Sequence, residues 1–272
     1  MLIKSFIFFT LYIYTCSAII DFKDSLLIKN SNLSQKNIKL FEKIYNVNNY
    51  EKTTVTHEAR IPKIIHQIWI GSKVPKKYHL LMETWKKKHP DWTFKLWTDE
   101  DINNFPFINK KAFDDAKNYG LKSDIWRIEI LFYYGGLYVD TDFECIKPFD
   151  ILHHSHDFYV GLICDVIPNG IIGSIPKHPI LQKCIKTLKN AKINEKSNPM
   201  EVSGPYFFTK IILNYLQTNS DNGLCIYPNS FFFPFPATLR QNYWKGKISR
   251  KELESFFKKE SFAVHLWATS WQ

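Results

Sequence analysis

The chain has 272 residues, of which 45% are hydrophobic, and it carries a formal net charge of +10. This length is enough for one sizeable domain with a buried core, so a small scaffold held together by disulfides is excluded. The excess positive charge comes from lysine, because Arg60, Arg127, Arg240 and Arg250 are the only arginines. Base readout and phosphate recognition depend largely on arginine forks. The composition therefore predicts that nucleic acid is not a partner of this protein.

An uncharged run of 16 residues, 5–20, follows Lys4 and is rich in Phe, Ile, Leu and Tyr. As a helix it would span about 24 Å, which is short of the ~30 Å hydrocarbon core of a membrane. Small residues at 16–18 suit a signal peptidase. Residues 1–20 are expected to be a cleaved signal peptide or a short signal-anchor that associates the chain with a membrane; an ordinary buried helix is the alternative. Either targeting role places the remaining chain in the secretory lumen (Golgi or ER), in the periplasm or outside the cell.

Residues 21–60 are rich in Lys, Asn, Ser and Thr and have weak periodicity, with some helical pattern around 37–46. They are predicted to form a stem or linker. The residue pattern changes at Ile61, where an apolar run typical of a β-strand extends to a glycine turn at Gly71. The sequence thus predicts a single domain over 61–272.

The chain after Gly71 alternates between helix and strand patterns. The predicted elements are a helix near 77–89 stopped by Pro90, a strand at 93–97, a helix beginning at 99–102, an apolar helix at 123–134 and a short buried strand at 137–139. Two glycines at 135 and 136 end the apolar helix. Strands that alternate with helices favour an α/β domain with a mostly parallel sheet flanked by helices.

Two carboxylates, Asp140 and Asp142, come directly after the strand predicted at 137–139. Like charges this close repel and raise each other's pKa unless a cation lies between them. A hard divalent ion such as Mg²⁺ or Mn²⁺ takes oxygen ligands and removes that conflict. Open sheets also bind ligands outside the carboxyl ends of their strands. The pair is a candidate metal site, and a solvated turn is the alternative.

A second charged pair, Asp124 and Arg127, lies on the helix predicted at 123–134, which is otherwise strongly apolar. A spacing of three puts both side chains on one face of the helix. Charges on so apolar a helix need a partner or a ligand. The choice of arginine in a lysine-rich chain favours a planar fork that grips a hydroxylated or anionic ligand. A self-contained ion pair is the alternative.

Three blocks of the sequence, 61–71, 122–127 and 134–142, together carry a family resemblance. The chain resembles glycosyltransferase family 32, the sugar transferases with an Asp-x-Asp motif that are similar to yeast initiating mannosyltransferases and inositol-phosphoceramide mannosyltransferases. The specific parts are the Ser-Asp-x-x-Arg and Gly-Gly-x-Tyr-x-Asp-x-Asp blocks. Shorter pieces at 168–174, 178–179, 203–205 and 265–271 agree, so that the resemblance covers roughly 61–271.

The resemblance implies a GT-A fold, which is Rossmann-like, and a single catalytic domain. That domain would transfer a hexose from a nucleotide sugar, a UDP- or GDP-hexose, to a glycan or glycolipid acceptor with retention of anomeric configuration. It also implies a divalent ion, Mn²⁺ or Mg²⁺. Asp142 would be a direct metal ligand, Asp140 would reach the metal or the donor ribose, and His265 would be the third protein ligand.

The other residues that the resemblance implies would bind the donor. Asp124 and Arg127 would hold the hydroxyls of the donor sugar, and Asn169 would face that sugar. Trp69 would stack on the nucleotide base. The remaining donor-binding residues are Gly71, Gly204, Ser270 and Trp271.

Two other functions use parts of the same pattern. A nucleotide-sugar hydrolase would need the same donor and metal site, with water in place of the acceptor. A non-catalytic carbohydrate-binding protein would need flat aromatic residues but no cage for a metal. The presence of both carboxylates together with Arg127 and His265 favours an enzyme over a binding protein.

Three histidines, His153, His154 and His156, form a cluster that imitates a metal site. Their place in the sequence, after the second strand that would follow the Asp-x-Asp motif, predicts a polar loop. We therefore do not expect this cluster to bind a metal.

Overall fold

The computed structural model describes residues 35–164, 166–194, 197–219 and 223–268. Their main feature is a six-stranded sheet, whose strands lie in the order β2 (Thr93–Trp97), β1 (Ile64–Ile68), β3 (Gly136–Val139), β6 (Ile171–Ser174), β5 (Phe158–Gly161) and β7 (Leu224–Tyr227). β6 runs antiparallel to both of its neighbours, and every other neighbouring pair is parallel. A small second sheet pairs β4 (Phe143–Cys145) with β8 (Ala263–His265) in antiparallel fashion.

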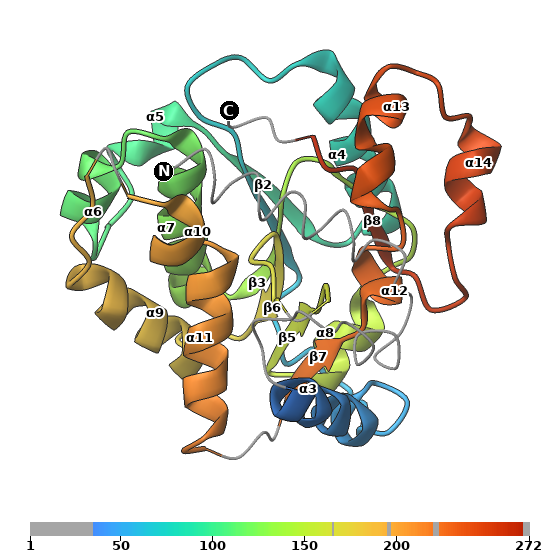
Figure 1. Ribbon diagram of the computed structural model, residues 1–272, viewed down its shortest axis with the longest axis horizontal. Coiled ribbons are helices and arrows are strands. Elements are labelled where there is room, and N and C mark those ends of the chain that lie inside the picture. The colour runs from blue at the N-terminus through green and yellow to red at the C-terminus, as the bar shows by residue number, and fades with distance from the viewer. Residues whose placement is uncertain (1–34, 165, 195–196, 220–222, 269–272) are drawn as a thin grey trace.

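Helices cover both faces of the large sheet (Figure 1). On one side lie α6 (Lys110–Asp115), α7 (Tyr119–Tyr134), α9 (Pro179–Lys189), α10 (Pro199–Val202) and α11 (Pro205–Leu216). On the other side, with the small sheet, lie α4 (Lys76–Lys88), α8 (Asp150–Ser155), α12 (Asn229–Phe232), the 3₁₀ turn η1 (Ala237–Leu239), α13 (Arg240–Trp244) and α14 (Arg250–Ser255). The short helix α5 (Asp99–Ile102) follows β2. The predicted α/β class, with a mostly parallel sheet flanked by helices, is confirmed.

Strands β3, β6, β5 and β7 are buried at every position, because their side chains alternate between two hydrophobic cores, whereas the edge strand β2 is only partly buried. On β3, Leu137 and Val139 pack into one core and Tyr138 packs into the other. No exposed position interrupts this strand. The first acidic side chain after it, Asp140, therefore emerges at the carboxyl edge of the sheet.

The turn from α7 into β3 is tight, and it sets the distance between the charges of the helix and those after the strand. α7 begins at Tyr119, four residues before the predicted start, because the side chain of Asn118 accepts a hydrogen bond from the first turn and caps the helix. Gly135 and Gly136 have positive φ angles of 61° and 95°. A Cβ at Gly136 would lie 2.6 Å from the carbonyl oxygen of Ile64, so this crossing requires glycine.

The helix expected around 37–46 is present as α3 (Gln35–Asn48). Its apolar face is buried through Ile38, Phe41 and Ile44, and the Asn48 side chain donates to the carbonyl oxygen of Leu224 on β7. Residues 35–48 thus pack with the body of the domain, although the sequence was interpreted as a stem there. The targeting segment predicted at 1–20 lies outside the described residues. In the described parts of the chain, no helix is both long enough and apolar enough to cross a membrane.

The interpretation of the three histidines as a polar loop is wrong. His153 and His154 lie in α8, and His153 and His156 are fully buried. Both ring nitrogens of His153 have partners, since Nδ1 lies 3.1 Å from the Ile61 carbonyl oxygen and Nε2 lies 3.0 Å from the Tyr159 hydroxyl.

Candidate active site

A cavity of about 580 Å³ opens at the carboxyl ends of β1 and β3. Its walls come from the turn after β1, the first half of α7, the residues after β3, the loop before β6 and the residues around β8. Among the lining residues are eight that the sequence predicted, namely Trp69, Gly71, Asp124, Arg127, Asp140, Asp142, Asn169 and His265. Gly204 does not line the cavity, and Ser270 and Trp271 lie outside the described residues.

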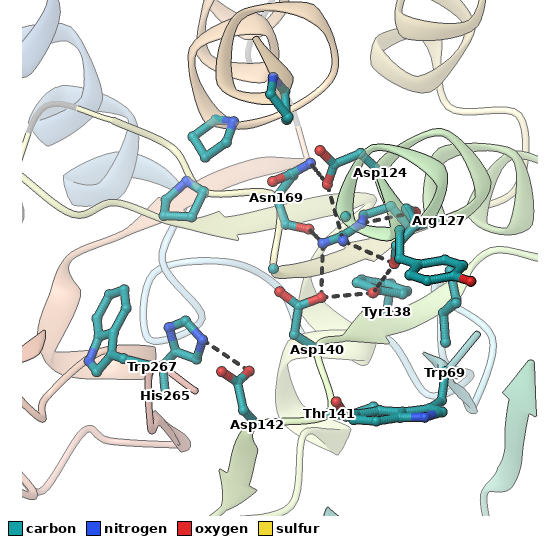
Figure 2. A pocket seen from close by; sticks show the side chains of 18 of the residues that line it. Trp69, Asp124, Arg127, Tyr138, Asp140, Thr141, Asp142, Asn169, His265 and Trp267 are labelled. Carbon is teal, nitrogen blue, oxygen red and sulfur yellow. Dashed lines mark hydrogen bonds and ion pairs between the residues drawn. The ribbon is translucent and has the colours of Figure 1, made fainter. Parts of the chain in front are cut away.

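The acidic motif meets a histidine from the far end of the chain (Figure 2). In the small sheet, β4 pairs with β8 so that Phe143 lies opposite His265. This register places Nε2 of His265 3.0 Å from Oδ1 of Asp142. One potential ligand atom from each of Asp140, Asp142 and His265 lies within 4.8 Å of the other two.

This donor set fits a divalent cation. Burial raises the pKa of the Asp140 carboxyl, Arg127 opposes that shift, and the negative charge of Asp142 adds to it. Burial acts in the same direction on Asp142, but the neighbouring His265 and hydrogen bonds from the backbone together outweigh it and leave the pKa of that carboxyl lowered. Two carboxylates and one imidazole that converge in this way offer the oxygen and nitrogen ligands that ions such as Mn²⁺ accept.

Arg127 connects the helix to the acidic motif (Figure 2). Its Nη2 lies 3.1 Å from Oδ1 of Asp124, and its Nη1 lies 3.0 Å from Oδ1 of Asp140. Nη1 also donates to the carbonyl oxygen of Asn169 at 2.8 Å. The Arg127 side chain is only 6% exposed, so its guanidinium is fixed in place before any ligand arrives. The structure thus shows the ion pair that the sequence left as an alternative, and it places that pair in the cavity wall.

Both carboxylate oxygens of Asp124 accept hydrogen bonds. Asn169 donates to Oδ1 through Nδ2, and the Ser203 hydroxyl donates to Oδ2, each at 2.9 Å. Burial raises the pKa of Asp124, while Arg127 and these two donors oppose the shift. Sequence reasoning did not assign a role to Ser203, although the Ser-Gly-Pro piece that contains it was part of the resemblance. The adjacent Gly204 permits close packing instead, since a Cβ there would lie 2.9 Å from the Pro199 carbonyl oxygen.

The turn after β1 forms the opposite edge of the cavity. Trp69 packs against Tyr78, with ring centroids 4.7 Å apart. Gly71 has a φ of +85°, and its backbone N–H donates to both carboxylate oxygens of Asp99. The Tyr119 ring occupies the place where a side chain at Gly71 would lie, because a Cβ there would be 2.2 Å from Cζ of Tyr119. The glycine is therefore required by the backbone angle and by the close approach of Tyr119.

Sequence reasoning missed several residues around Asp140. The Tyr138 hydroxyl donates to Oδ1 of Asp140 at 2.7 Å, and the guanidinium of Arg127 lies 4.5 Å from the centre of the Tyr138 ring. A Cβ at Gly170 would lie 2.6 Å from Oδ2 of Asp140, so the absence of a side chain there leaves room for the carboxylate. Tyr138 belongs to the Gly-Gly-x-Tyr-x-Asp-x-Asp block, which was the available signal. Arg240 and Trp267 also line the cavity.

Two family profiles match the chain in succession. Residues 75–159 match the glycosyltransferase sugar-binding region containing a DXD motif. Residues 174–272 match the alpha 1,4-glycosyltransferase conserved region. The first match contains Asp124, Arg127, Asp140 and Asp142, and the second contains His265. The two matches therefore include five of the eight predicted residues that line the cavity, whereas Trp69, Gly71 and Asn169 lie outside the matched ranges.

Curated relatives carry consistent names. Inositol phosphoceramide mannosyltransferase 1 of Schizosaccharomyces pombe is 32% identical over 64% of this chain and 60% of its own length. The mannosyl phosphorylinositol ceramide synthase CSH1 of Saccharomyces cerevisiae is also 32% identical, over 60% of this chain and 46% of its own length. The chain thus spans between about half and three fifths of these two relatives. The uncharacterized glycosyltransferase L373 of Acanthamoeba polyphaga mimivirus is 30% identical over 64% of this chain and 73% of its own length.

The chain belongs to the glycosyltransferases with a DXD motif, and the resemblance to glycosyltransferase family 32 is confirmed. Both profiles and the named relatives support this family assignment. Its sheet, with one antiparallel strand among parallel ones and helices on both faces, is the GT-A arrangement that the resemblance implies. Among solved structures, the PaToxG glycosyltransferase is 25% identical, with a TM-score of 0.48 over 68% of this chain and 77% of that one.

Proposed function

We propose that this protein is a metal-dependent, retaining glycosyltransferase that moves a hexose from a nucleotide sugar to a hydroxyl of a glycan or glycolipid. One observation carries the proposal. The three candidate metal ligands, Asp140, Asp142 and His265, lie in the same cavity as the ion pair of Asp124 and Arg127. A metal site beside a polar, buried hydrogen-bonding cluster is what binding of a pyrophosphate and its attached sugar requires.

Asp140, Asp142 and His265 would hold the cation, Mn²⁺ or Mg²⁺. The Asp140 side chain is 31% exposed and is therefore the ligand most open to the cavity. Departure of a nucleoside diphosphate leaves negative charge on the pyrophosphate, and a bound divalent ion supplies electrostatic stabilisation of that charge. The chain supplies the fixed geometry, because Arg127 and Tyr138 both hold Oδ1 of Asp140.

The donor sugar would lie against Asp124, Arg127 and Asn169, whose polar atoms are already oriented by one another. Such prearranged groups bind hydroxyls without reorganisation in the transition state. The nucleotide would lie at the opposite edge, where Trp69 offers a ring for the base and the turn through Gly71 lines the cavity. Gly204, Ser270 and Trp271 remain predicted donor-binding residues, and Gly204 would act by shaping the wall.

Retention of configuration is proposed to occur by attack of the acceptor hydroxyl on the same face as the leaving group. A double displacement would need a free carboxylate as nucleophile. Asp124 accepts hydrogen bonds at both oxygens and pairs with Arg127, so it is poorly placed to attack. Asp142 is bound by His265 and by the backbone of Ala268. Isolation of a covalent sugar–protein adduct would overturn this part of the proposal.

A glycolipid acceptor and a secretory location complete the proposal. The relatives from the two yeasts are named for inositol phosphoceramide and mannose. This supports a mannosyl donor and a lipid-linked acceptor as the first pair to test. The apolar segment at 1–20, as a signal peptide or signal-anchor, would bring the domain into the lumen.

The decisive experiment is a hydrolysis screen of UDP- and GDP-sugars with the purified protein, in Mn²⁺ and in EDTA. We expect one nucleotide-sugar pair to be turned over slowly in Mn²⁺ and not in EDTA. Addition of the correct acceptor should convert that hydrolysis into transfer. Turnover that no glycan or glycolipid accelerates would identify a hydrolase instead, and equal rates in EDTA would contradict the metal role.

A further inference from the structure

We propose that Trp267 is a positioning residue, which holds His265 and Asp142 in the arrangement that binds the divalent cation. The inference rests on the proposed function, because it concerns the same metal site. Trp267 follows β8, lines the cavity and lies beside His265 (Figure 2). Three separate observations support the role.

The first observation is the packing of the His265 ring between aromatic neighbours. The ring stacks on Phe143, with centroids 4.4 Å apart and planes 12° apart. Trp267 lies closer still, at 4.1 Å with an angle of 51° between planes. Phe233 contacts both rings, each at 5.9 Å. These rings restrict the rotation of the imidazole about its side-chain bonds.

The second observation concerns the nitrogen of His265 that faces away from the carboxylate. Nε2 lies 3.0 Å from Oδ1 of Asp142, whereas Nδ1 is buried and has no hydrogen-bond partner among the residues that the structure describes. A metal-binding histidine usually donates from its second nitrogen to a carboxylate or a carbonyl, and this contact fixes the ring. Because that support is missing here, the aromatic contacts must orient the ligand.

The third observation is the backbone of Trp267, which has a φ of 55°. The left-handed region is unfavourable for a non-glycine residue, and such strain is often found at functional sites. The indole Nε1 donates to the carbonyl oxygen of Phe235 at 2.8 Å and anchors the residue. Directly after this turn, the backbone N–H of Ala268 donates to Oδ2 of Asp142 at 2.7 Å. Trp267 therefore connects the orientation of His265 to that of Asp142.

The chain provides a matched control at Trp92. This residue contacts the buried His153 with centroids 4.2 Å apart and planes 49° apart, almost the geometry of the Trp267–His265 pair. Its Nε1 also donates a hydrogen bond, to Asp150 at 3.2 Å, and it does not line the cavity. Trp92→Leu thus removes an equivalent ring contact with a histidine and an equivalent indole hydrogen bond, and it leaves the metal site unchanged.

The test is direct binding of Mn²⁺, without donor, by the metal-free full-length protein, measured from the paramagnetic resonance signal of free Mn²⁺. We expect Trp267→Leu to raise the Kd about tenfold or more, in the range found when the support of a metal ligand is removed. Trp267→Phe keeps a ring and should stay within about threefold of wild type. Trp267→Gly relieves the backbone strain but removes the ring, so it should weaken binding as Trp267→Leu does. Trp92→Leu should lower Tm and leave the Kd unchanged.

The outcomes separate this inference from the proposed function. If wild type binds Mn²⁺, Asp142→Ala does not, and folded Trp267→Leu or Trp267→Gly binds as wild type does, the role of Trp267 alone is overturned. If wild type binds no Mn²⁺, the metal site and this inference are both overturned. If Trp267→Leu does not fold, the Mn²⁺ Kd of Trp267→Gly is compared with that of Trp267→Phe. Weaker binding by Trp267→Gly supports the role of the ring, and equal binding by the two variants overturns it.

Discussion

Two histidine–tryptophan pairs in this protein have nearly the same ring geometry and different surroundings. His265 and Trp267 lie 4.1 Å apart in the cavity wall, and His153 and Trp92 lie 4.2 Å apart in the core. The angles between ring planes are 51° and 49°. Ring packing alone therefore does not tell a functional histidine from a structural one.

The difference lies in what the imidazole nitrogens face. Both nitrogens of His153 have partners that carry no charge, and burial lowers the pKa of this ring to about 3. His265 directs one nitrogen at the Asp142 carboxylate, and its other nitrogen has no hydrogen-bond partner in the described part of the chain. A neutral histidine with satisfied nitrogens stabilises a fold, whereas one aimed at converging carboxylates is available to a cation.

The largest effect on stability is expected at the charged centre of the cavity. Arg127→Ala leaves Asp124 buried without its ionic partner, so we expect the free energy of unfolding to fall by about 3–5 kcal/mol. Urea denaturation measures this loss. Arg60→Ala is the control, since its pair with Asp157 has side chains that are 36% and 28% exposed. That pair should contribute less than about 1 kcal/mol, and equal losses in the two variants would contradict the distinction.

Substitution of each histidine in turn tests whether the two pairs have different roles. His265→Ala should weaken Mn²⁺ binding at least about ten- to a hundredfold, because it removes a ligand. It should lower the free energy of unfolding less than His153→Ala does, because the His265 side chain is 15% exposed whereas His153 is fully buried. His153→Ala should lower the free energy of unfolding by about 2–4 kcal/mol, because it leaves a cavity and unpaired buried groups, and should leave Mn²⁺ binding unchanged. Calorimetric metal titration and urea denaturation measure the two effects. The opposite assignment of effects would show that the roles are reversed.

Acid should destabilise the structural histidines as a group. Burial lowers the pKa of His66 and His178 to about 4 and that of His153 and His156 to about 3. The unfolded chain, with histidine pKa near 6.5, takes up protons first as the pH falls. The contribution of each neutral histidine to stability is therefore present above pH 6.5. It is lost as the pH falls from 6.5 to about 4 for His66 and His178 and to about 3 for His153 and His156, by roughly 1–2 kcal/mol per histidine at pH 5.

Urea denaturation at pH 7 and pH 5 tests this pH dependence. The carboxyls of Glu129, Asp124 and Asp140, whose pKa burial raises, oppose the trend, so the observed loss is a net value. Stability that is equal or higher at pH 5 would show that these histidines do not remain neutral in the fold.

The smallest effect is expected at the hydroxyl of Tyr138. Tyr138→Phe removes one of the two groups that hold Oδ1 of Asp140, while Arg127 remains. We expect kcat/KM to fall about three- to tenfold, which corresponds to a hydrogen bond of roughly 1 kcal/mol. Tyr133→Phe is the control, because its hydroxyl donates to the Pro106 carbonyl oxygen outside the cavity. A larger loss in Tyr133→Phe than in Tyr138→Phe would contradict this role.

Local patterns in the sequence predicted the N-terminal half of the sheet and its acidic edge. The strand at 93–97 was predicted with the bounds that the structure shows, and a helix does begin at 99, although it is only the short α5. Apolar runs, glycine pairs and a proline stop are local signals, which is why they sufficed here. α7 begins earlier than predicted because the Asn118 side chain caps it. In the sequence, this one cap residue did not outweigh the polar residues around it.

Long-range contacts were beyond this reasoning. His265 reaches Asp142 through the pairing of β4 with β8, across more than a hundred residues, and the family resemblance alone pointed to it. Ser203 reaches Asp124 across 79 residues of sequence. The antiparallel direction of β6 is likewise set by the tertiary packing. The polar composition around His153 suggested a loop. This composition did not reveal that His153 is buried, because its partners, the Ile61 carbonyl oxygen and the Tyr159 hydroxyl, come from other elements of the fold.

The most direct test of the account is sugar transfer by wild type and Asp142→Ala, measured across a Mn²⁺ titration with the donor that the hydrolysis screen selects. Asp157→Ala is the control, because Asp157 is an acidic residue outside the cavity. We predict Mn²⁺-dependent transfer by wild type and by Asp157→Ala, and a loss of at least about a hundredfold in Asp142→Ala that added Mn²⁺ does not restore. Normal Mn²⁺-dependent transfer by folded Asp142→Ala would contradict the account.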